Sequence, residues 1–379
     1  MRYGRQEGTP LLQALRLEAE RAEALVRFDV PGHRQGRMAS DFSRALGDLG
    51  LRMDVNATPG LDFLDHPTGV IRDAECLMAN ACDADEAFFL VNGSSVGVVA
   101  MILSACGPGD TILLPRNVHR SAIHALVLGG AVPVFLPPEA DPTLGIAHGV
   151  RPAAVRDALD RHPEARALLL LHPTYFGVCG DFAAIADLCR KRGVRLLSDS
   201  AHGAHFGFAR GLPPSALSLG ADLCTVSVHK TCGSLTQSSV LLLRERAIRH
   251  ETVRGVLNLL QTSSASYLLL SSLDSARRWL VHEARDTFAA LLPQVDDLRR
   301  RVAAIPGLRL MAPPEGMTLD PTKLTLDVSG LGISGFEAYR RLRERWGVQM
   351  ELAEARVLLA VVSPADGPES LSRLADALE

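Results

Sequence analysis

The sequence predicts an α/β fold with a mostly parallel seven-stranded sheet, followed by a second and smaller α/β unit. Between residues 86 and 243, short apolar runs alternate with segments of helical periodicity. This alternation is typical of parallel strands covered by helices on both faces. A shorter series of strand-like and helix-like segments follows Pro306 and Gly307. With 379 residues, 47% of them hydrophobic, the chain is long enough for two domains.

The elements are expected in a definite order. An amphipathic helix over residues 10–26 precedes a turn at Pro31 and Gly32. Seven strands then alternate with helices, at residues 87–91, 111–114, 132–136, 167–171, 194–197, 223–228 and 239–243. One long amphipathic helix is predicted over 275–302, with its arginine run on a solvated face. The smaller unit should hold strands at 308–311, 323–328, 348–352 and 357–362 and helices at 335–346 and 369–378.

These boundaries divide the chain into three parts. They are an N-terminal segment of residues 1–40, a large domain of residues 41–274, and a linking helix with a small C-terminal domain over residues 275–379. We expect the small domain to close over a site on the large one. Ligands of open parallel sheets bind outside the carboxyl ends of the strands, so the residues after each strand are the first candidates.

The most informative of these segments is Ser227-Val228-His229-Lys230-Thr231. It closes an apolar run that is typical of a buried strand, where a surface lysine is not expected. Burial disfavours the ammonium form and lowers the pKa, as a lysine that attacks an aldehyde near neutral pH requires. The alternative is a solvated lysine at a strand end, and this segment alone leaves it open. Cys232, two residues further on, is interpreted as a small packing residue.

A second segment, from Asp199 to His205, follows the strand predicted over 194–197. An aspartate at this position could keep a pyridine nitrogen protonated, which makes the ring an electron sink. Ala201 is small enough to lie against a flat ring. Read alone, Asp199 could equally cap the next turn, with His202 and His205 facing water.

Two more segments follow earlier strands. In Asn92-Gly93-Ser94-Ser95, small hydroxyl residues at a helix start could bind a phosphate, although an ordinary serine cap is the alternative. In the segment 116–121, His119 could stack on a ring whose other face meets Ala201, or begin a helix with no ligand. Together the four segments predict a pyridoxal phosphate site.

The order and spacing of these pieces resemble the Orn/Lys/Arg decarboxylase family, a branch of the fold-type I (aspartate aminotransferase-like) pyridoxal phosphate enzymes. The resemblance extends from about residue 31 to 277. The matching stretches are Pro31-Gly32-His33-Arg34-Gln35-Gly36, Leu61-Asp62-Phe63-Leu64-Asp65-His66-Pro67-Thr68-Gly69, Asn92-Gly93-Ser94-Ser95, Arg116-Asn117-Val118-His119, Asp199-Ser200-Ala201-His202-Gly203-Ala204-His205, Ser227-Val228-His229-Lys230-Thr231 and Thr262-Ser263-Ser264-Ala265-Ser266-Tyr267.

The resemblance implies a role for each candidate residue. Lys230 would form the Schiff base, Asp199 would pair with the ring nitrogen, and His119 would stack on the ring. His202 would lie near the ring hydroxyl. The phosphate would be surrounded by Ser94, Ser95, Ser227 and His229, and Thr262 or Ser263 would reach the phosphate of a neighbouring subunit. This arrangement implies a homodimer or a higher homo-oligomer, which is also the commonest kind of assembly.

The sequence departs from the family pattern at positions that bear on the substrate. The family usually has a lysine at the position of Arg34 and a glutamate at that of Ser200. A Thr-Glu pair usually precedes the Leu61-Asp62 motif, where this chain has Asp54-Val55-Asn56-Ala57. We also expect a short member without the usual further C-terminal domain.

Three hypotheses follow for the function. The first is decarboxylation of a basic or related amino acid. The second is another reaction on the same scaffold, such as an aminotransferase, an aldol-type lyase or a specialised biosynthetic enzyme, and the departures favour it. The third is a non-catalytic binding protein. Arg356, at the start of a predicted small-domain strand, could anchor a substrate carboxylate or form a surface ion pair. His202 and His229 are candidate proton donors.

Composition excludes several other classes. A formal charge of −3 provides no broad basic field, so we expect no nucleic-acid partner. No apolar run has membrane-spanning length and the first residues do not resemble a signal peptide, so a cytoplasmic protein with no membrane contact is expected. The seven cysteines contain no Cys-x-x-Cys pair. A disulfide framework or a metal site is therefore not predicted.

Overall fold

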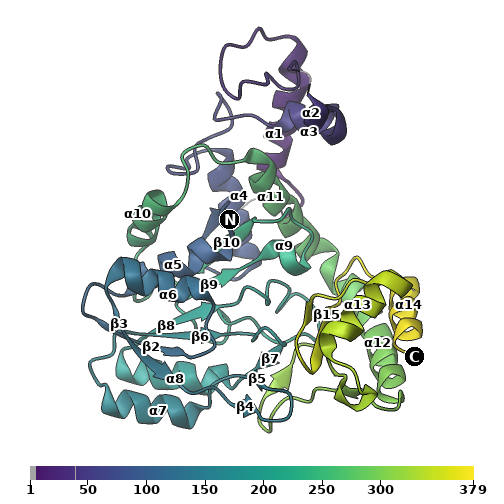
Figure 1. The fold of residues 1–379 in the computed structure, drawn as a ribbon. Helices are drawn as coiled ribbons and strands as arrows, with labels where there is room; N and C mark the ends of the chain where they lie inside the picture. Colours follow the sequence, from purple (N-terminus) through teal and green to yellow (C-terminus); the bar gives the residue numbers. More distant parts are fainter. Residues whose placement is uncertain (1–5, 39) are drawn as a thin grey trace.

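The computed structural model describes residues 6–38 and 40–379, and a seven-stranded sheet lies at its centre (Figure 1). The strand order is β1-β10-β9-β8-β6-β2-β3. Strands β3, β2, β6, β8 and β9 pair in parallel, whereas β10 is antiparallel to both β9 and β1. The bounds are β1 (Glu86–Leu90), β2 (Thr111–Pro115), β3 (Val132–Leu136), β6 (Ala167–Leu171), β8 (Arg195–Asp199), β9 (Leu223–Val226) and β10 (Ser239–Leu243). The predicted mostly parallel α/β sheet is confirmed.

Helices cover both faces of this sheet because each strand is apolar on both sides. In β1, Phe88 and Leu90 belong to one core cluster, while Ala87 and Phe89 belong to another. The first face carries α5 (Gly93–Ala105), α6 (Arg120–Gly129) and α10 (His250–Leu260). The second core cluster includes residues of α1 (Pro10–Glu20), α4 (Val70–Ala81), α7 (Pro152–Arg161), α8 (Phe182–Arg192), α11 (Tyr267–His282) and α12 (Ala284–Ala303). Figure 1 shows α7 and α8 below the sheet, opposite α5 and α6.

The long helix predicted before the small domain has different bounds in the structure. The single helix expected over 275–302 is wrong, because α11 ends at His282 and α12 begins at Ala284. Glu283 between them has φ −121° and ψ −29°, outside the helical range. Helix α11 packs on α1 and α4, whereas α12 packs on α14 (Pro368–Leu378). The two helices thus have different packing partners, and the predicted domain boundary after residue 274 falls inside α11.

The N-terminal segment contains shorter helices than predicted. Helix α1 ends at Glu20, and a 3₁₀ turn, η1 (Arg21–Glu23), follows it. Two short helices, α2 (Asp41–Leu46) and α3 (Asp48–Met53), come next. Ser40 caps α2 by accepting a hydrogen bond from Ser43 N. This region protrudes at the top of Figure 1.

The smaller unit contains a four-stranded sheet in the order β11-β13-β15-β14. Its strands are β11 (Arg309–Leu310), β13 (Lys323–Asp327), β14 (Leu352–Ala353) and β15 (Val357–Val361), with α13 (Gly335–Trp346), α14 and the 3₁₀ turn η2 (Ser329–Leu331). The strand predicted over 348–352 is therefore reduced to β14. The structure also describes two short strand pairs. In one, β12 (Thr318–Leu319) pairs with β7 (Val178–Cys179) of the large unit, and in the other β4 (Ala140–Asp141) pairs with β5 (Ile146–Ala147).

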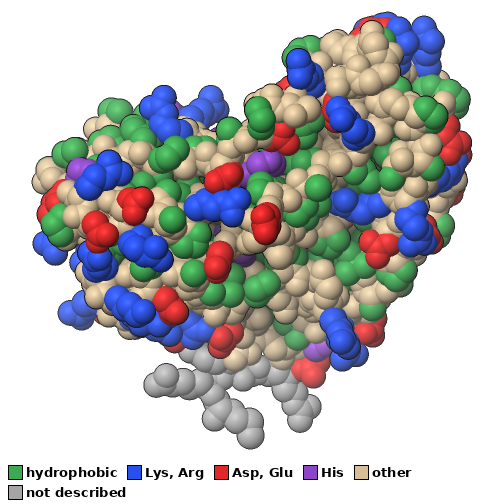
Figure 2. Space-filling view, turned by 90° about the horizontal axis from the view of Figure 1, so that it is seen from below, with side chains coloured by type: hydrophobic (Ala, Val, Ile, Leu, Met, Phe, Trp, Pro, Cys, Tyr) green, Lys and Arg blue, Asp and Glu red, His purple; other side chains and the backbone are tan. Residues whose placement is uncertain are grey.

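The surface carries charges of both signs. Figure 2 shows Lys and Arg side chains interspersed with Asp and Glu side chains over one face of the molecule. Across residues 6–38 and 40–379, no helix is long and apolar enough to span a membrane. Within those same ranges the structure contains no cluster of three or more potential metal ligands, and all seven cysteines are free.

Candidate active site

A cavity of about 730 Å³ opens at the carboxyl ends of the central strands. Its walls come from loops after β1, β2, β6, β8 and β9 and from the β14 region of the small unit. The lining residues include nine of the predicted site residues, namely Ser94, Ser95, His119, Asp199, Ala201, His202, Ser227, His229 and Lys230. The structure thus brings together segments that are far apart in the sequence.

Lys230 lies on a single helical turn rather than at a strand end. Strand β9 ends at Val226, and α9 (Val228–Thr231) follows directly, so the strand predicted through residue 228 is too long. Lys230 Nζ lies 2.9 Å from His202 Nε2, and the side chain is exposed to the cavity. Desolvation by the surrounding walls lowers the pKa of Lys230, while Asp199 partly opposes this shift. A lowered pKa is what a nucleophilic lysine requires.

Asp199 is the last residue of β8 and is buried. Its Oδ1 accepts a hydrogen bond from Ala201 N at 3.1 Å. Burial raises the pKa of Asp199, and the hydrogen bond and the charges of Lys230 and His119 only partly offset that effect. Among the described residues, no basic group forms an ion pair with this carboxylate within 4.0 Å. A buried carboxylate in this state favours a cationic ligand group.

The start of α5 also lines the cavity. Gly93 has φ +73°, and its N–H donates to the carbonyl of Gln237, which itself has φ +84°. The Ser227 hydroxyl lies 2.8 Å from Ser94 Oγ. A Cβ added at Gly97 would meet Thr225 Oγ1 at 2.2 Å, so glycine is what allows α5 to pack on β9. Hydroxyls and free backbone N–H groups gathered at a helix start suit a phosphate.

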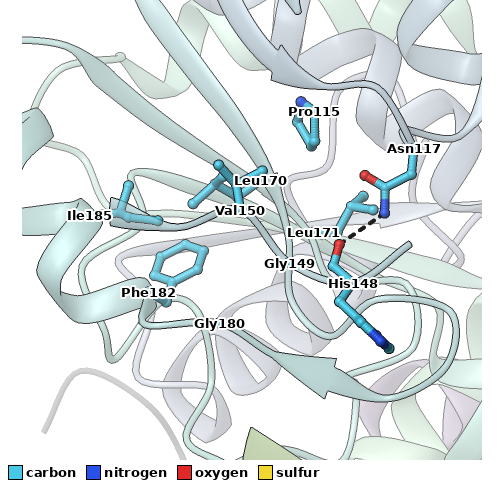
Figure 3. Close-up of a pocket in the computed structure, with 10 residues that line it drawn as sticks. All are labelled: Pro115, Asn117, His148, Gly149, Val150, Leu170, Leu171, Gly180, Phe182 and Ile185. Atoms are coloured by element: carbon cyan, nitrogen blue, oxygen red, sulfur yellow. Dashed lines mark hydrogen bonds between the residues drawn. The ribbon is translucent and has the colours of Figure 1, made fainter. Parts of the chain in front are cut away.

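His119 is the N-cap of α6, and its Nδ1 lies 2.8 Å from Ser121 Oγ. Burial lowers the pKa of His119, which favours the neutral ring that stacking on a heterocycle requires. Two residues earlier, Asn117 donates to the carbonyl of His148 at 3.1 Å. Figure 3 shows this bond beside a small second cavity of about 20 Å³, which shares Asn117 and Leu171 with the large one. This hydrogen bond joins the loop that carries His119 to the segment that contains His148.

His229 lines the cavity from α9. Its Nδ1 lies 2.8 Å from the carbonyl of Ser238. A carbonyl can only accept, so Nδ1 carries the proton and Nε2 is the atom left to accept or exchange one.

Three predicted site residues do not line this cavity. Thr262 and Ser263 are exposed, and they lie outside the cavity of their own chain. Arg356 is exposed as well, and its guanidinium donates to the carbonyl of Thr143 at 2.8 Å. Cys232 is buried, and burial raises the pKa of its thiol to about 12, so it is a protonated packing residue.

The sequence interpretation missed four residues around the site. Lys323, the first residue of β13, places its Nζ 2.9 Å from His202 Nδ1. Tyr175 packs edge-on against His202, with ring centroids 4.7 Å apart. Asp320 is buried behind this group, and Glu354 lines the cavity. Lys323 opens a strand in which Leu324 and Leu326 alternate with Thr325 and Asp327, so the sequence pattern alone does not mark this lysine as buried.

The arrangement fits pyridoxal phosphate. Lys230 would hold it covalently, buried Asp199 would supply the missing partner of a protonated ring nitrogen, and the start of α5 would bind the phosphate. His119 and Ala201 would lie on the two faces of the ring. The observations behind this fit are the burial of Asp199 without an ion-pair partner among the described residues and the hydroxyls of Ser94 and Ser227 at the start of α5.

Comparisons with known proteins agree with this geometry. The family model of the major domain of Orn/Lys/Arg decarboxylases matches residues 9–315. The chain is 42% identical over 380 residues to a protein of Halalkalibacterium halodurans named arginine decarboxylase, which covers 99% of this chain and 77% of that protein. An arginine decarboxylase of Bacillus subtilis is 40% identical over 379 residues, with 98% and 77% covered.

Solved structures show the same fold. The constitutive lysine decarboxylase of E. coli superposes with a TM-score of 0.84 at 22% identity, over 98% of this chain and 60% of that one. An alanine–glyoxylate aminotransferase of Nostoc superposes with a TM-score of 0.66 at 21% identity, over 86% of this chain and 88% of that one. The present chain therefore spans about three fifths of the lysine decarboxylase. By fold, motifs and sequence match, the chain belongs to the Orn/Lys/Arg decarboxylase family of fold-type I, pyridoxal phosphate-dependent enzymes.

Proposed function

We propose that this protein decarboxylates a basic amino acid, with arginine as the first candidate. The arginine decarboxylases that it resembles cover nearly the whole chain. Bound pyridoxal phosphate would supply an electron sink for the bond that breaks at the substrate's α-carbon. The protein's own residues decide which bond that is and which side chain is accepted.

The observation that carries the proposal is the absence of arginine from the described cavity lining. An aminotransferase usually anchors the substrate carboxylate with a guanidinium. Here the cavity wall presents apolar side chains instead, among them Leu171, Pro173, Phe176 and Leu352. A carboxylate against such a wall is poorly solvated, which favours the loss of its charge as CO2.

Acidic groups support a basic substrate. Of the described residues that line the cavity, two carry a carboxylate, Asp199 and Glu354. Asp199 is buried and would pair with the ring nitrogen, whereas Glu354 is exposed on the small unit. Glu354 is thus the carboxylate available to pair with a guanidinium or ammonium group of the substrate.

One assay separates the reaction types. The holoenzyme is incubated in D2O with arginine, lysine, ornithine and a mixed amino-acid panel, while CO2 is followed by mass spectrometry and the α-carbon by NMR. We expect CO2 release from at least one basic amino acid, with deuterium entering at the α-carbon. Keto-acid formation or α-proton exchange without CO2 over the whole panel would favour an aminotransferase or another reaction on this scaffold.

A variant tests the substrate class. Glu354→Gln should raise KM for the preferred basic amino acid about tenfold or more, as expected for a lost charged hydrogen bond. The control is Glu369→Gln, an exposed glutamate in the first turn of α14, which should leave KM unchanged. Equal KM values for the two variants would remove Glu354 from substrate binding.

The active form is proposed to be at least a homodimer. The N-terminal region exposes several large apolar side chains, among them Val26, Phe28, Met38, Phe42, Leu49 and Phe63, and a surface of this kind indicates a covered interface. Thr262 and Ser263 are exposed, as residues that reach a neighbour's phosphate would be in one isolated chain. Sedimentation should give a dimer or larger, and a fully active, cofactor-loaded monomer would refute the proposal. The cytoplasmic location and the absence of a nucleic-acid partner stay predictions from composition.

A further inference from the structure

One imidazole is shared by two lysines at the edge of the cavity. His202 Nε2 lies 2.9 Å from Lys230 Nζ, and its Nδ1 lies 2.9 Å from Lys323 Nζ. A neutral imidazole has one N–H and one lone pair, so it accepts a hydrogen bond from one lysine only and donates to the other. An ammonium group cannot accept. If His202 is neutral, one of the two lysines is an ammonium donor and the other must accept as an uncharged nitrogen.

His202 itself is held in the neutral state. The residue is 8% exposed, and burial together with the charges of Lys323 and Lys230 lowers the pKa of His202 well below the ordinary value. A third cation between two lysines would be strongly disfavoured. The state of this group therefore depends on which lysine remains the cation.

Lys323 and Lys230 have very different surroundings. Lys323 is 1% exposed, and His202 Nδ1 is the hydrogen-bond acceptor found for its Nζ among the described residues. Lys230 is exposed to the cavity and can turn toward water. When Lys230 carries the cofactor it no longer competes as an ammonium group. Lys323 is then the lysine left to donate to His202.

The buried neighbour of Lys323 is a carboxylate. Asp320 is fully buried and accepts hydrogen bonds from Thr322 N at 3.0 Å and Thr322 Oγ1 at 2.7 Å. His205 Nε2 is 3.2 Å from Asp320 Oδ2, close enough for an ion pair although not aligned as a hydrogen bond. Although desolvation opposes it, these groups and the charge of Lys323 lower the pKa of Asp320. An ionised Asp320 in turn favours the charged form of Lys323.

The backbone at Gly177 leaves room for the Lys323 side chain. A Cβ added at Gly177, which has φ +88°, would lie 2.7 Å from both Cβ and Cγ of Lys323. The carbonyl of Gly177 accepts a hydrogen bond from Asp320 N at 2.8 Å. The loop before β13 is therefore fixed to the loop before β7, and the Lys323 side chain is directed from the small unit into the large one.

We propose that Lys323 is a positioning residue that donates to His202 Nδ1 and so keeps the Nε2–H of His202 directed at Lys230 Nζ. The inference rests on the proposed role of Lys230 as the residue that binds the cofactor. Through Lys323, the small unit determines which hydrogen bond Lys230 Nζ receives from His202.

The titratable groups that face this pair come from several elements. They are Lys230 and His229 on α9, His205 after β8, Asp320 before β13, and Glu351 with its hydrogen-bonded partner Tyr175. Burial lowers the pKa of Lys323 to about 8. A transition of the imidazole signals near pH 8 is therefore expected when Lys323 loses its proton.

The test is ¹⁵N NMR of histidine rings in the cofactor-free protein, which needs no catalytic activity. Comparison with His202→Gln assigns the signals of His202. At pH 7, wild type should show the neutral tautomer protonated at Nε2, with a change near pH 8 that persists in Lys230→Ala. In Lys323→Met, Lys230 becomes the competing donor, so the proton should move to Nδ1 and the transition near pH 8 should vanish.

The control is Thr325→Val, a near-isosteric change at a buried residue two positions along the same strand. It should leave the tautomer and the activity unchanged, whereas Lys323→Met should lower kcat about 10- to 100-fold with KM within about threefold. Wild-type His202 protonated at Nδ1 or at both nitrogens at pH 7 would overturn the inference, and so would an unchanged tautomer in Lys323→Met. The expected tautomer without CO2 release from any amino acid would instead refute the proposed function alone.

Discussion

Two aspartates are buried near the site, Asp199 at the end of β8 and Asp320 in the loop between β12 and β13. Their surroundings shift the two carboxyl pKa values in opposite directions. Asp320 Oδ1 accepts two hydrogen bonds from Thr322, and these bonds, with the nearby His205 and Lys323, lower the pKa of Asp320 although burial opposes the shift. Within the part of the chain that the structure describes, Asp199 accepts one backbone hydrogen bond and has no ion-pair partner within 4.0 Å, and burial raises its pKa. Two buried carboxylates therefore have shifted pKa values of opposite sign, because the charged and polar groups around them differ.

The difference separates a structural group from a ligand-binding group. A buried charge that the chain itself neutralises contributes to stability, whereas one that it leaves unpaired lowers stability until a ligand arrives. Asp320 belongs to the first kind and Asp199 to the second. The same contrast holds for the two lysines, since Lys323 is enclosed and Lys230 faces the cavity.

The largest effect is expected at the lysine on the ligand side. Lys230→Ala should lower the decarboxylation rate by about 10⁴-fold or more, a typical cost for a covalent catalytic group. Purified wild type should be yellow, and borohydride should abolish its visible absorption band. The variant should lack that band even if some cofactor stays bound through its phosphate. An unchanged band in Lys230→Ala would remove this residue from the covalent site.

The next largest effect is expected at Asp320. Asp320→Asn should lower the free energy of unfolding by about 3–5 kcal/mol near neutral pH, because it leaves Lys323 buried without its counter-charge. A lowered pKa in the folded state stabilises the fold above the ordinary carboxyl pKa, and this contribution is lost as pH falls below about 4. Chemical denaturation at pH 7 and pH 3 should show the gap between the two proteins narrowing at the lower pH. A gap independent of pH would refute the charged state of Asp320.

Asp199→Asn should have the opposite sign in the cofactor-free protein. A raised carboxyl pKa means that stability falls as pH rises through that pKa. Removing the charge should therefore leave the cofactor-free fold at least as stable at pH 8, with a gain on the order of 1 kcal/mol. Thermal melts should show this, together with weaker cofactor retention in a dialysis experiment. Destabilisation similar to that of Asp320→Asn would mean that the two aspartates are alike.

The smallest effect is expected at Arg356. Its guanidinium binds a backbone carbonyl outside the cavity, so Arg356→Ala should change kcat/KM by less than about 0.5 kcal/mol, as for other exposed charges. Steady-state kinetics with the preferred amino acid are sufficient. A loss of about 2–5 kcal/mol would instead restore Arg356 as the carboxylate anchor.

The sequence predicted the elements that local patterns specify. All seven central strands agree within two residues at each end, and α13 agrees at both ends, because strong apolar periodicity bounded by polar turns defines such elements. The break at Glu283 was missed, since the apolar stripe continues across it while the packing partners change. Residues after the strands were found as candidates because parallel strands direct their carboxyl ends to one edge.

The sequence by itself determined the fold class, the family and nine of the residues that line the cavity at the strand ends, since motifs and the order of elements along the chain can be recognised from local patterns. Only the tertiary structure decided which charges are satisfied. Lys323 is 121 positions from His202 in the chain, and no pattern along the sequence relates them. Whether a carboxylate or lysine is paired depends on burial and on distances across the fold, and these exist only once the two units have packed together.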